Sequence, residues 1–362
     1  MDAVTVIVVE DDKVLRFLQV LLDPATSAER LAVFDDYVAH DIKQDDWFAA
    51  ARARLAGVFP GEIRLVNSAA ALHAALPQAA ALVVESMAVG AAELALAPQL
   101  RFIHQFGTRA DNIDLAACAA RGVVVKTQRR RTNVAVAEHT MALILALAKQ
   151  LHRLSGRVTV DRLQQLGYAC RPYDTRHTGA NNYGRVGGLR VIRGMTLGLL
   201  GMGEIARELV PMARAFGLQI QYHRRRRLSA AEEAELGIRY CSREALFESA
   251  DILSVHVPLE AATRGLVGAD ELGRIKPGAW LINTSRAAIV DHDALLAALQ
   301  SGRLAAAAAD VHYTEPVAAD EPLLAFDNFL MTPHFAGGPR QTLLDDIEEI
   351  ALNIQQVLAP HT

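Results

Sequence analysis

The sequence predicts an α/β protein of two domains. Its 362 residues are enough for two hydrophobic cores, and 51% of them are hydrophobic. Apolar runs of strand length alternate with helical patterns along most of the chain. This alternation is typical of parallel sheets covered by helices on both faces. A long helical pattern over 134–154 has the length expected of a helix that bridges two domains.

The first half contains five strand-like runs, at 4–9, 63–66, 81–84, 102–105 and 123–125. Helical patterns lie between them at 44–55, 69–76 and 115–120. The acids Glu10, Asp11 and Asp12 resemble the start of a bacterial receiver domain, in which paired acids hold Mg²⁺. Such a domain needs an acceptor aspartate at the end of a later strand, and residues 47–52 offer neither. We therefore predict a polar turn after the first strand.

The middle of the chain predicts one helix and one insertion. Asn133 is a suitable N-cap for the helix over 134–154, whose buried face includes Met141, Leu145 and Ala148. Residues 155–193 are rich in Gly, Arg, Tyr and Asn. Loops of this length are uncommon in compact domains and are usually functional or mobile. We expect an insertion that forms an arm or a flap.

The second half predicts a dinucleotide-binding domain. Six strand-like runs lie at 196–200, 218–222, 252–256, 279–283, 304–309 and 329–331. Six is the strand count of such a domain. One helix follows Asp291 and ends near Gly302, and the tail 342–358 is a last amphipathic helix.

The turn after the first of these runs has the pattern G-x-G-x-x-A. Gly201 permits a tight turn, Gly203 lets a pyrophosphate approach the backbone, and Ala206 takes the third small position. The free N–H groups at the start of the next helix favour an anion. Because a strand precedes the turn and a helix follows it, we predict cofactor contacts from Gly201, Met202, Gly203, Glu204 and Ile205.

The end of the second strand of this half selects the cofactor. An NAD site usually places Asp or Glu there to bond the ribose 2′-hydroxyl. This chain has His223 followed by four arginines at 224–227. These cations suit a 2′-phosphate, so we predict NADP(H), with contacts from His223, Arg224 and Arg225. The alternative is a solvated basic turn, which leaves NAD(H) possible.

Composition excludes several other classes of function. The net charge of −4 argues against general affinity for nucleic acid. The three cysteines are scattered and suit a reducing compartment, and no His/Cys/Asp cluster has metal-ligand spacing. No apolar stretch reaches membrane-spanning length, and the start lacks a signal-peptide pattern. We expect a cytoplasmic protein with no metal, no nucleic-acid partner and no membrane partner.

Six motifs, in order, resemble the D-isomer-specific 2-hydroxyacid dehydrogenase family, in particular its glyoxylate/hydroxypyruvate reductases and phosphoglycerate dehydrogenase-like members. They are GTRADNID at 107–114, AEH at 137–139, HVPL at 256–259, NTSR at 283–286, DV at 310–311 with EP at 315–316, and TPH at 332–334. The resemblance implies a flavodoxin-like substrate domain, formed by 1–130 plus 336–362, and a Rossmann domain at 131–335. It also implies an active site in the cleft between the two domains and a homodimer.

The implied reaction is the reversible reduction of a 2-oxo acid to a D-2-hydroxy acid by hydride from the cofactor. His334 is the expected general acid, because histidine titrates near working pH. Glu315 would orient its imidazole and keep it protonated, and Arg286 would hold the carbonyl oxygen and the carboxylate. The resemblance assigns these catalytic roles to Arg286, Glu315 and His334. It adds cofactor contacts from Val257, Pro258, Thr284, Ser285 and Asp310.

The substrate carboxylate is expected on the backbone N–H groups of Gly107, Thr108 and Arg109. The family usually has glycine in place of Arg109, so we expect a strained turn, since arginine tolerates positive φ poorly. If the Arg109 side chain points toward the cleft, its charge would favour a larger or dianionic acid as substrate. If it points outward, it would be solvated. Two other functions stay open: a non-enzymatic dinucleotide-sensing regulator similar to a corepressor, and a phosphonate or formate dehydrogenase.

Overall fold

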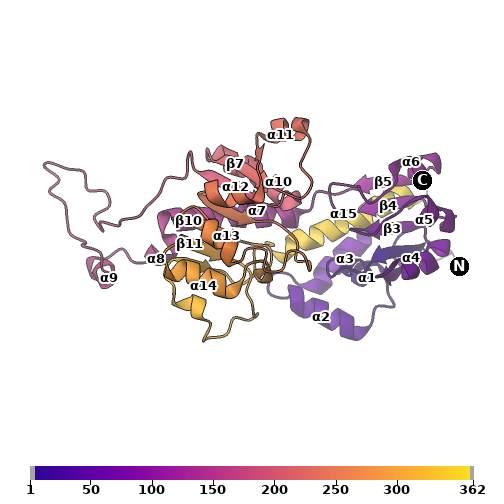
Figure 1. The fold of residues 1–362 in the computed structure, drawn as a ribbon. Coiled ribbons are helices and arrows are strands. Elements are labelled where there is room, and N and C mark those ends of the chain that lie inside the picture. Colours follow the sequence, from indigo (N-terminus) through magenta and orange to yellow (C-terminus); the bar gives the residue numbers. More distant parts are fainter. Residues whose placement is uncertain (1–4, 359–362) are drawn as a thin grey trace. The chain divides into compact units, whose positions relative to one another are not determined.

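The computed structural model describes residues 5–358, which form two compact units (Figure 1). Among the described residues, the first unit comprises residues 5–133 and 338–358, and the second comprises Val134–Gly337. Each unit contains one parallel sheet. Of the strand predicted at 4–9, Val4 lies outside the described residues.

The first unit has a five-stranded sheet of order β2-β1-β3-β4-β5, the order of flavodoxin-like folds. Its strands are β1 (Thr5–Glu10), β2 (Gly61–Val66), β3 (Ala81–Val84), β4 (Phe102–Gln105) and β5 (Val124–Thr127). Its helices are α1 (Phe17–Leu22), α2 (Ala28–Val38), α3 (Gln44–Arg54), α4 (Ala69–Ala75), the 3-10 helix η1 (Leu76–Gln78), α5 (Ala91–Leu96), α6 (Leu115–Ala120) and α15 (Arg340–Leu358). Ile7 and Val9 pack into one core and Val8 into another, so helices cover both faces of this sheet.

The predicted polar turn after β1 is confirmed. The Asp12 carboxylate accepts hydrogen bonds from the backbone N–H groups of Val14 at 2.7 Å and Leu15 at 3.3 Å. Residues 47–52, where a receiver domain would need a strand, lie in α3. The predicted strands of this unit are present within two residues of their expected ends.

The second unit has a seven-stranded sheet of order β12-β11-β10-β9-β6-β7-β8. Its strands are β6 (Thr196–Leu200), β7 (Gln219–His223), β8 (Arg239–Tyr240), β9 (Ile252–Val255), β10 (Ala279–Asn283), β11 (Leu304–Ala309) and β12 (Phe329–Met331). Its helices, one of which begins in the first unit, are α7 (Arg131–Lys149), α8 (Leu151–Leu154), α9 (Val160–Gln165), α10 (Glu204–Ala215), α11 (Ala230–Leu236), α12 (Arg243–Ser249), α13 (Ala269–Arg274), α14 (His292–Gln300) and the 3-10 helices η2 (Ala287–Ile289) and η3 (Pro322–Ala325). The prediction of six strands is wrong, because the two-residue β8 is too short to produce a sequence pattern.

The predicted bridging helix differs from the structure at both ends. Helix α7 begins at Arg131, so Asn133 lies inside its first turn and is not the N-cap. The helix ends at Lys149, because Gln150 adopts a left-handed conformation with φ 50° before the short α8 begins. The single helix predicted over 134–154 is therefore wrong.

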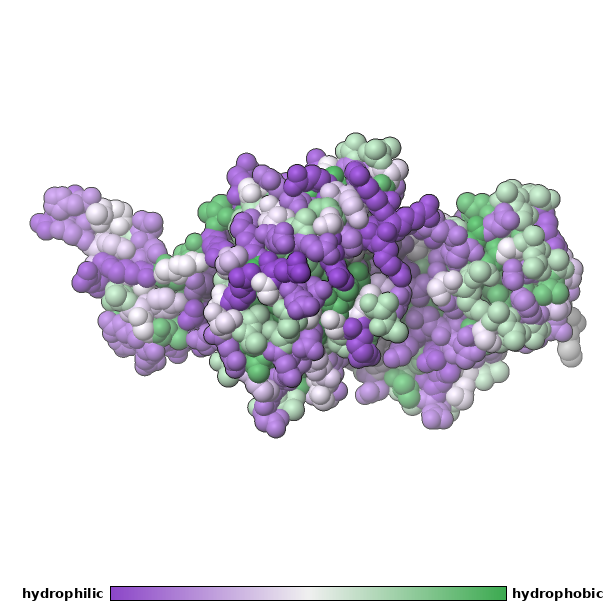
Figure 2. Space-filling model, viewed as in Figure 1, coloured by the Kyte–Doolittle hydropathy of each residue, from purple (hydrophilic) through white to green (hydrophobic). Residues whose placement is uncertain are grey.

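The segment 155–193 contains α9, and residues 166–195, all described, form no helix or strand. It extends away from the sheet of the second unit (Figure 1). Its visible surface is mostly hydrophilic (Figure 2), although Val158 and Val191 are exposed.

The order of the seven strands defines the place where a ligand crevice forms. From β6 the chain continues to β7 and β8 on one side, and then returns to build β9 to β12 on the other. The order therefore reverses between β6 and β9. In open parallel sheets, ligands bind at such a switch point, outside the carboxyl ends of the strands.

Candidate active site

The glycine turn joins β6 to α10 at this switch point. Gly201 has φ 105°, and a Cβ atom added to it would lie 2.4 Å from the carbonyl oxygen of His256. Only glycine fits there without a shift of the backbone. A Cβ atom on Gly203, the N-cap of α10, would meet no atom within 4 Å. The open space before the helix N-terminus fits a pyrophosphate.

A pocket of about 510 Å³ adjoins this turn and has the size of a small-molecule site. The turn and the ends of β7 and β9 supply most of its lining, including the predicted contacts Gly201, Met202, Gly203, His223, Arg224, Arg225, Val257 and Pro258. The other predicted contacts, Glu204, Ile205, Thr284, Ser285 and Asp310, are not part of this lining. Three strand ends that are distant in sequence thus form one pocket.

The lining is rich in positive charge. Arg226 and Arg243 line the pocket together with Arg224 and Arg225, and Glu260 adds one negative charge. Arg225 lies 3.9 Å from Glu260. We did not predict Arg243 from the sequence, because it lies on α12, after β8 and outside every motif. The excess of cations suits an additional phosphate.

The last arginine of the run, Arg227, has a different role. It pairs with Glu233 of α11 at 2.7 Å, and Tyr222 of β7 donates its hydroxyl to the same carboxylate at 2.7 Å. These hydrogen bonds, with Arg227 the larger cause, lower the pKa of Glu233 to about 2. Burial raises the pKa of Tyr222 to about 12. The network holds the loop that presents the other arginines.

The three predicted catalytic residues follow neighbouring strands. Arg286 comes after β10, Glu315 after β11 and His334 after β12, so their loops leave the same edge of the sheet. The Glu315 Oε2 atom lies 2.7 Å from His334 Nδ1. Arg286 is exposed, and its Nη1 donates to the carbonyl oxygen of Ser285 at 2.7 Å. The structure thus brings Glu315 and His334 into direct contact.

The contact fixes the position of one proton. Because a carboxylate only accepts, His334 Nδ1 is the donor, and Nε2 is left to exchange a proton with a ligand. Burial raises the pKa of Glu315, but the hydrogen bonds from His334 and from the backbone of His312 outweigh it and lower the pKa overall. The carboxylate therefore stays charged beside the imidazole.

Asp310 holds the turn that carries His334. Its carboxylate is fully buried and accepts hydrogen bonds from Thr332 Oγ1 at 2.6 Å, Phe335 N at 3.1 Å and Ala336 N at 2.7 Å. These donors flank His334, which has the left-handed φ of 53°. Such a conformation persists in a non-glycine residue only when its surroundings hold it. Whether Asp310 also contacts a nicotinamide stays a prediction.

His139 of α7 supports the same turn. Its Nε2 lies 3.0 Å from Thr332 Oγ1 and 3.7 Å from Asp310, and its ring meets Phe335 edge-on at 5.0 Å. Burial lowers the pKa of His139, against the opposing effect of Asp310. This support was not predicted, because nothing in the sequence connects residue 139 to residue 332.

Thr284 and Ser285, two of the predicted cofactor contacts, have side chains that form hydrogen bonds with other residues of the second unit. The hydroxyl of Thr284 lies 3.0 Å from that of Thr140, and Ser285 donates its hydroxyl to the Val255 carbonyl at 2.9 Å. The Asn283 side chain binds the backbone of both Ser285 and Arg286, at 3.0 Å in each case. These bonds shape the loop after β10, and the cofactor contacts of Thr284 and Ser285 stay predictions.

The predicted substrate loop follows β4 of the first unit. Gly107 has φ 148°, and its carbonyl accepts the Gln128 N–H at 2.9 Å. Arg109 is not among the described non-glycine residues with positive φ, so the expected backbone strain is wrong. Its guanidinium lies 2.6 Å from the Asp111 carboxylate. This pairing offsets part of the charge that Arg109 would offer to a substrate.

Comparison with known proteins identifies the family. Residues 141–336 match the family model described as D-isomer specific 2-hydroxyacid dehydrogenase, NAD binding domain. The chain belongs to this family. It is therefore an NAD(P)-dependent oxidoreductase, and membership favours the enzyme over the non-enzymatic regulator.

Relatives of this dehydrogenase cover most of its length. It is 41% identical to a glyoxylate reductase from Aeropyrum pernix, over 69% of this chain and 71% of that protein. It is 34% identical to glyoxylate/hydroxypyruvate reductase B from Salmonella newport, over 75% and 79%. A solved formate dehydrogenase from Granulicella is similar with a TM-score of 0.52 and 27% identity, over 80% of this chain and 75% of that one.

Within residues 5–358, no group of three or more His, Cys, Asp or Glu residues could hold a metal ion. No helix in residues 5–358 is long and apolar enough to cross a membrane. Cys118 of α6 is buried.

Proposed function

We propose that this dehydrogenase reduces a small 2-oxo acid with NADPH, and that glyoxylate and hydroxypyruvate are the first candidates. The 2.7 Å contact between Glu315 and His334 carries the proposal, because it leaves one imidazole nitrogen available for proton transfer. The names of the reductases from Aeropyrum pernix and Salmonella newport support these substrates.

The bound nicotinamide cofactor supplies hydride to the carbonyl carbon of the 2-oxo acid. His334 donates the proton on Nε2 to the carbonyl oxygen, which completes the hydroxy acid. Glu315 stabilises the imidazolium before this transfer and holds its ring. In the reverse direction, neutral His334 accepts the hydroxyl proton at the same nitrogen.

The substrate is anchored by one permanently charged side chain and by backbone N–H groups. Arg286, at the end of β10, offers a charged fork to the carbonyl oxygen and the carboxylate. Backbone N–H groups of Gly107, Thr108 and Arg109 are the proposed contacts of the carboxylate.

A spectrophotometric assay tests this function. NADPH and NADH oxidation are measured with glyoxylate, hydroxypyruvate, pyruvate, phenylpyruvate and 2-oxoglutarate, with formate plus NAD(P)⁺ as the test of the rival reaction. We expect turnover with the smallest oxo acids and NADPH. Turnover with formate alone, or silence across the oxo acids while NADPH still binds, would contradict the proposal.

The preference for NADPH rests on the arginines of the pocket. In the double variant Arg224→Ala/Arg225→Ala, we expect the Kd of NADPH to rise severalfold, up to about thirtyfold, since each exposed ion pair contributes up to about 1 kcal/mol. The Kd of NADH should change little. Arg176→Ala, which removes an exposed arginine paired with Asp174 outside the pocket, is the control for lost charge. Equal weakening of both cofactors would refute the preference.

Homodimer formation stays a prediction from the family resemblance, and a cytoplasmic location stays a prediction from the composition of the chain. Sedimentation equilibrium of the purified protein tests the first, and a single monomeric species would contradict it. Cell fractionation tests the second.

A further inference from the structure

His312 lies in the loop that carries Glu315 and has no role in the function proposed above. Its backbone N–H donates to Glu315 Oε1 at 3.0 Å. Its Nε2 atom lies 2.8 Å from the carbonyl oxygen of Thr332. A carbonyl oxygen only accepts, so Nε2 carries a proton and donates it. One residue therefore binds both the carboxylate of the Glu315–His334 pair and the turn that leads to His334.

The Thr332 carbonyl is shared by two donors. Besides the imidazole of His312, it accepts the backbone N–H of His334 at 2.9 Å. This second bond closes the turn in which His334 takes its left-handed φ of 53°. The His312 ring is thus bonded to the same atom that positions the backbone of His334.

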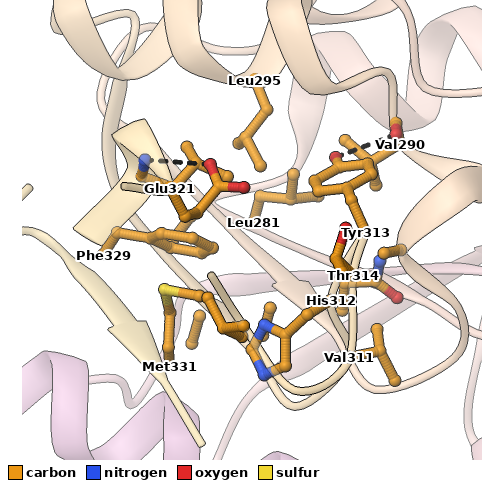
Figure 3. Close-up of a pocket in the computed structure, with 17 residues that line it drawn as sticks. Leu281, Val290, Leu295, Val311, His312, Tyr313, Thr314, Glu321, Phe329 and Met331 are labelled. Carbon is orange, nitrogen blue, oxygen red and sulfur yellow. Dashed lines mark hydrogen bonds between the residues drawn. The ribbon is translucent and has the colours of Figure 1, made fainter. Parts of the chain in front are cut away.

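The surroundings of the ring restrict its movement. In Figure 3, His312 lies beside Met331 of β12 and on the same cavity as Tyr313 and Glu321. The space left in this cavity is about 20 Å³, room for about one water molecule. Because so little space is free, the imidazole has few alternative positions on the side of this cavity.

We propose that His312 is a positioning residue for the Glu315–His334 pair. It ties the loop after β11 to the turn after β12, and so sets the position of the Glu315 carboxylate relative to the imidazole of His334. This inference rests on the proposed function, in which that pair holds the transferred proton. It predicts an effect on proton transfer rather than on the binding of cofactor or substrate.

Three substitutions separate the hydrogen bond from the shape of the ring. His312→Phe keeps a ring and loses the donor. His312→Gln keeps an N–H donor at similar reach, whereas His312→Asn is one methylene shorter and cannot reach Thr332 equally well. The matched control is Tyr313→Phe, which removes a 3.0 Å hydrogen bond to the Val290 carbonyl from the same loop.

The readouts are kcat, KM and the pH profile of kcat/KM for 2-oxo acid reduction. We expect His312→Phe and His312→Asn to lower kcat about tenfold, the effect of losing one well-placed hydrogen bond in the transition state. KM should change little. A less well-placed Glu315 also loses part of the hydrogen bonding that lowers its pKa against the effect of burial, so the acid limb of the profile moves to higher pH. His312→Gln should recover most of both properties, and Tyr313→Phe should resemble the wild type.

The outcomes distinguish this inference from the function on which it rests. If His334→Ala retains turnover, the proposed function fails. If His334→Ala is inactive but His312→Phe and His312→Asn keep wild-type kcat and pH profile, the positioning role is refuted. A loss in Tyr313→Phe equal to that in His312→Phe would also refute it, because any loosening of the loop would then suffice. If the His312→Phe variant does not fold, the comparison of His312→Asn with His312→Gln tests the positioning role.

Discussion

The hydroxyl of Thr332 offers a direct test of how the turn that carries His334 is held. It donates to Asp310 Oδ1 at 2.6 Å and lies 3.0 Å from His139 Nε2. Thr332→Val keeps the branched shape of the side chain and removes only these polar contacts. We expect a less stable second unit and a lower kcat, because the turn loses one of its attachments to Asp310.

The magnitude follows from the burial of Asp310. Its carboxylate is fully buried, and without the hydroxyl its Oδ1 atom keeps only the Phe335 N–H at 3.1 Å. A hydrogen bond to a charged group contributes about 1.5–3 kcal/mol. For a domain of this size, each kcal/mol shifts Tm by about 2–4 °C. We therefore expect Tm to fall by roughly 3–12 °C, and by less if His139, 3.7 Å from Asp310, moves to replace the lost donor.

Thr332→Ser is the matched control, because it keeps the hydroxyl and loses one methyl group of a half-buried side chain. That methyl contributes less than about 1 kcal/mol, so the serine variant should melt only a few degrees below the wild type. Thermal unfolding followed by circular dichroism, with kcat measured on the same samples, compares the variants. A valine variant as stable and as active as the serine variant would refute the role given to the hydroxyl.

Three further predictions concern the glycine turn, the arginine loop and the general acid. Gly201→Ala should abolish NADPH binding in a fluorescence titration, because its Cβ would lie 2.4 Å from the His256 carbonyl oxygen; wild-type affinity would contradict the fitted turn. The lowered pKa of Glu233 means that its pairing with Arg227 stabilises the fold above pH 4.5 and is lost as the pH falls toward about 2. Between pH 4.5 and about 2, the urea midpoint of the Glu233→Gln variant should therefore vary less with pH than the midpoint of the wild type. If the midpoints of both proteins depend on pH in the same way, this contribution is excluded. His334→Ala should cut turnover by roughly 10²–10⁴ while NADPH affinity stays nearly constant, and surviving turnover would rule out His334 as the acid.

The sheets could be predicted from the sequence because their central strands are buried on both faces. Such strands form continuous apolar runs, and Ala81–Val84 and Phe102–Gln105 match the prediction residue for residue. Two of the elements that were missed give no pattern of their own type. Helix α1 is buried at five of its six positions, so it lacks the polar face that marks a helix, while β8 has two residues and forms by pairing with β7.

The candidate site also has a part that could be predicted from the sequence and a part that could not. The glycine turn and the proximity of Glu315 to His334 follow from motifs that are short and contiguous in the sequence. The hydrogen bonds that support these residues do not follow from any motif. Asp310 and His312 bind backbone atoms of residues 332–336, and Arg243 reaches the cofactor pocket from α12. Backbone atoms carry no residue-specific signal, so only the fold reveals these partners.

The strand ends of this sheet fall into two groups with different tasks. The ends of β6, β7 and β9 form the pocket with the excess of arginines, whereas the ends of β10, β11 and β12 carry Arg286, Glu315 and His334. The side chain of His312 acts on the second set, since its hydrogen bond joins the loop after β11 to the turn after β12. Substitutions in the arginine loop should therefore change cofactor affinity and leave the pH profile in place. Substitutions at His312 should change kcat and the pH profile and leave cofactor affinity in place. A variant of one set that produced the effects of the other would show that the two strand groups are mechanically coupled.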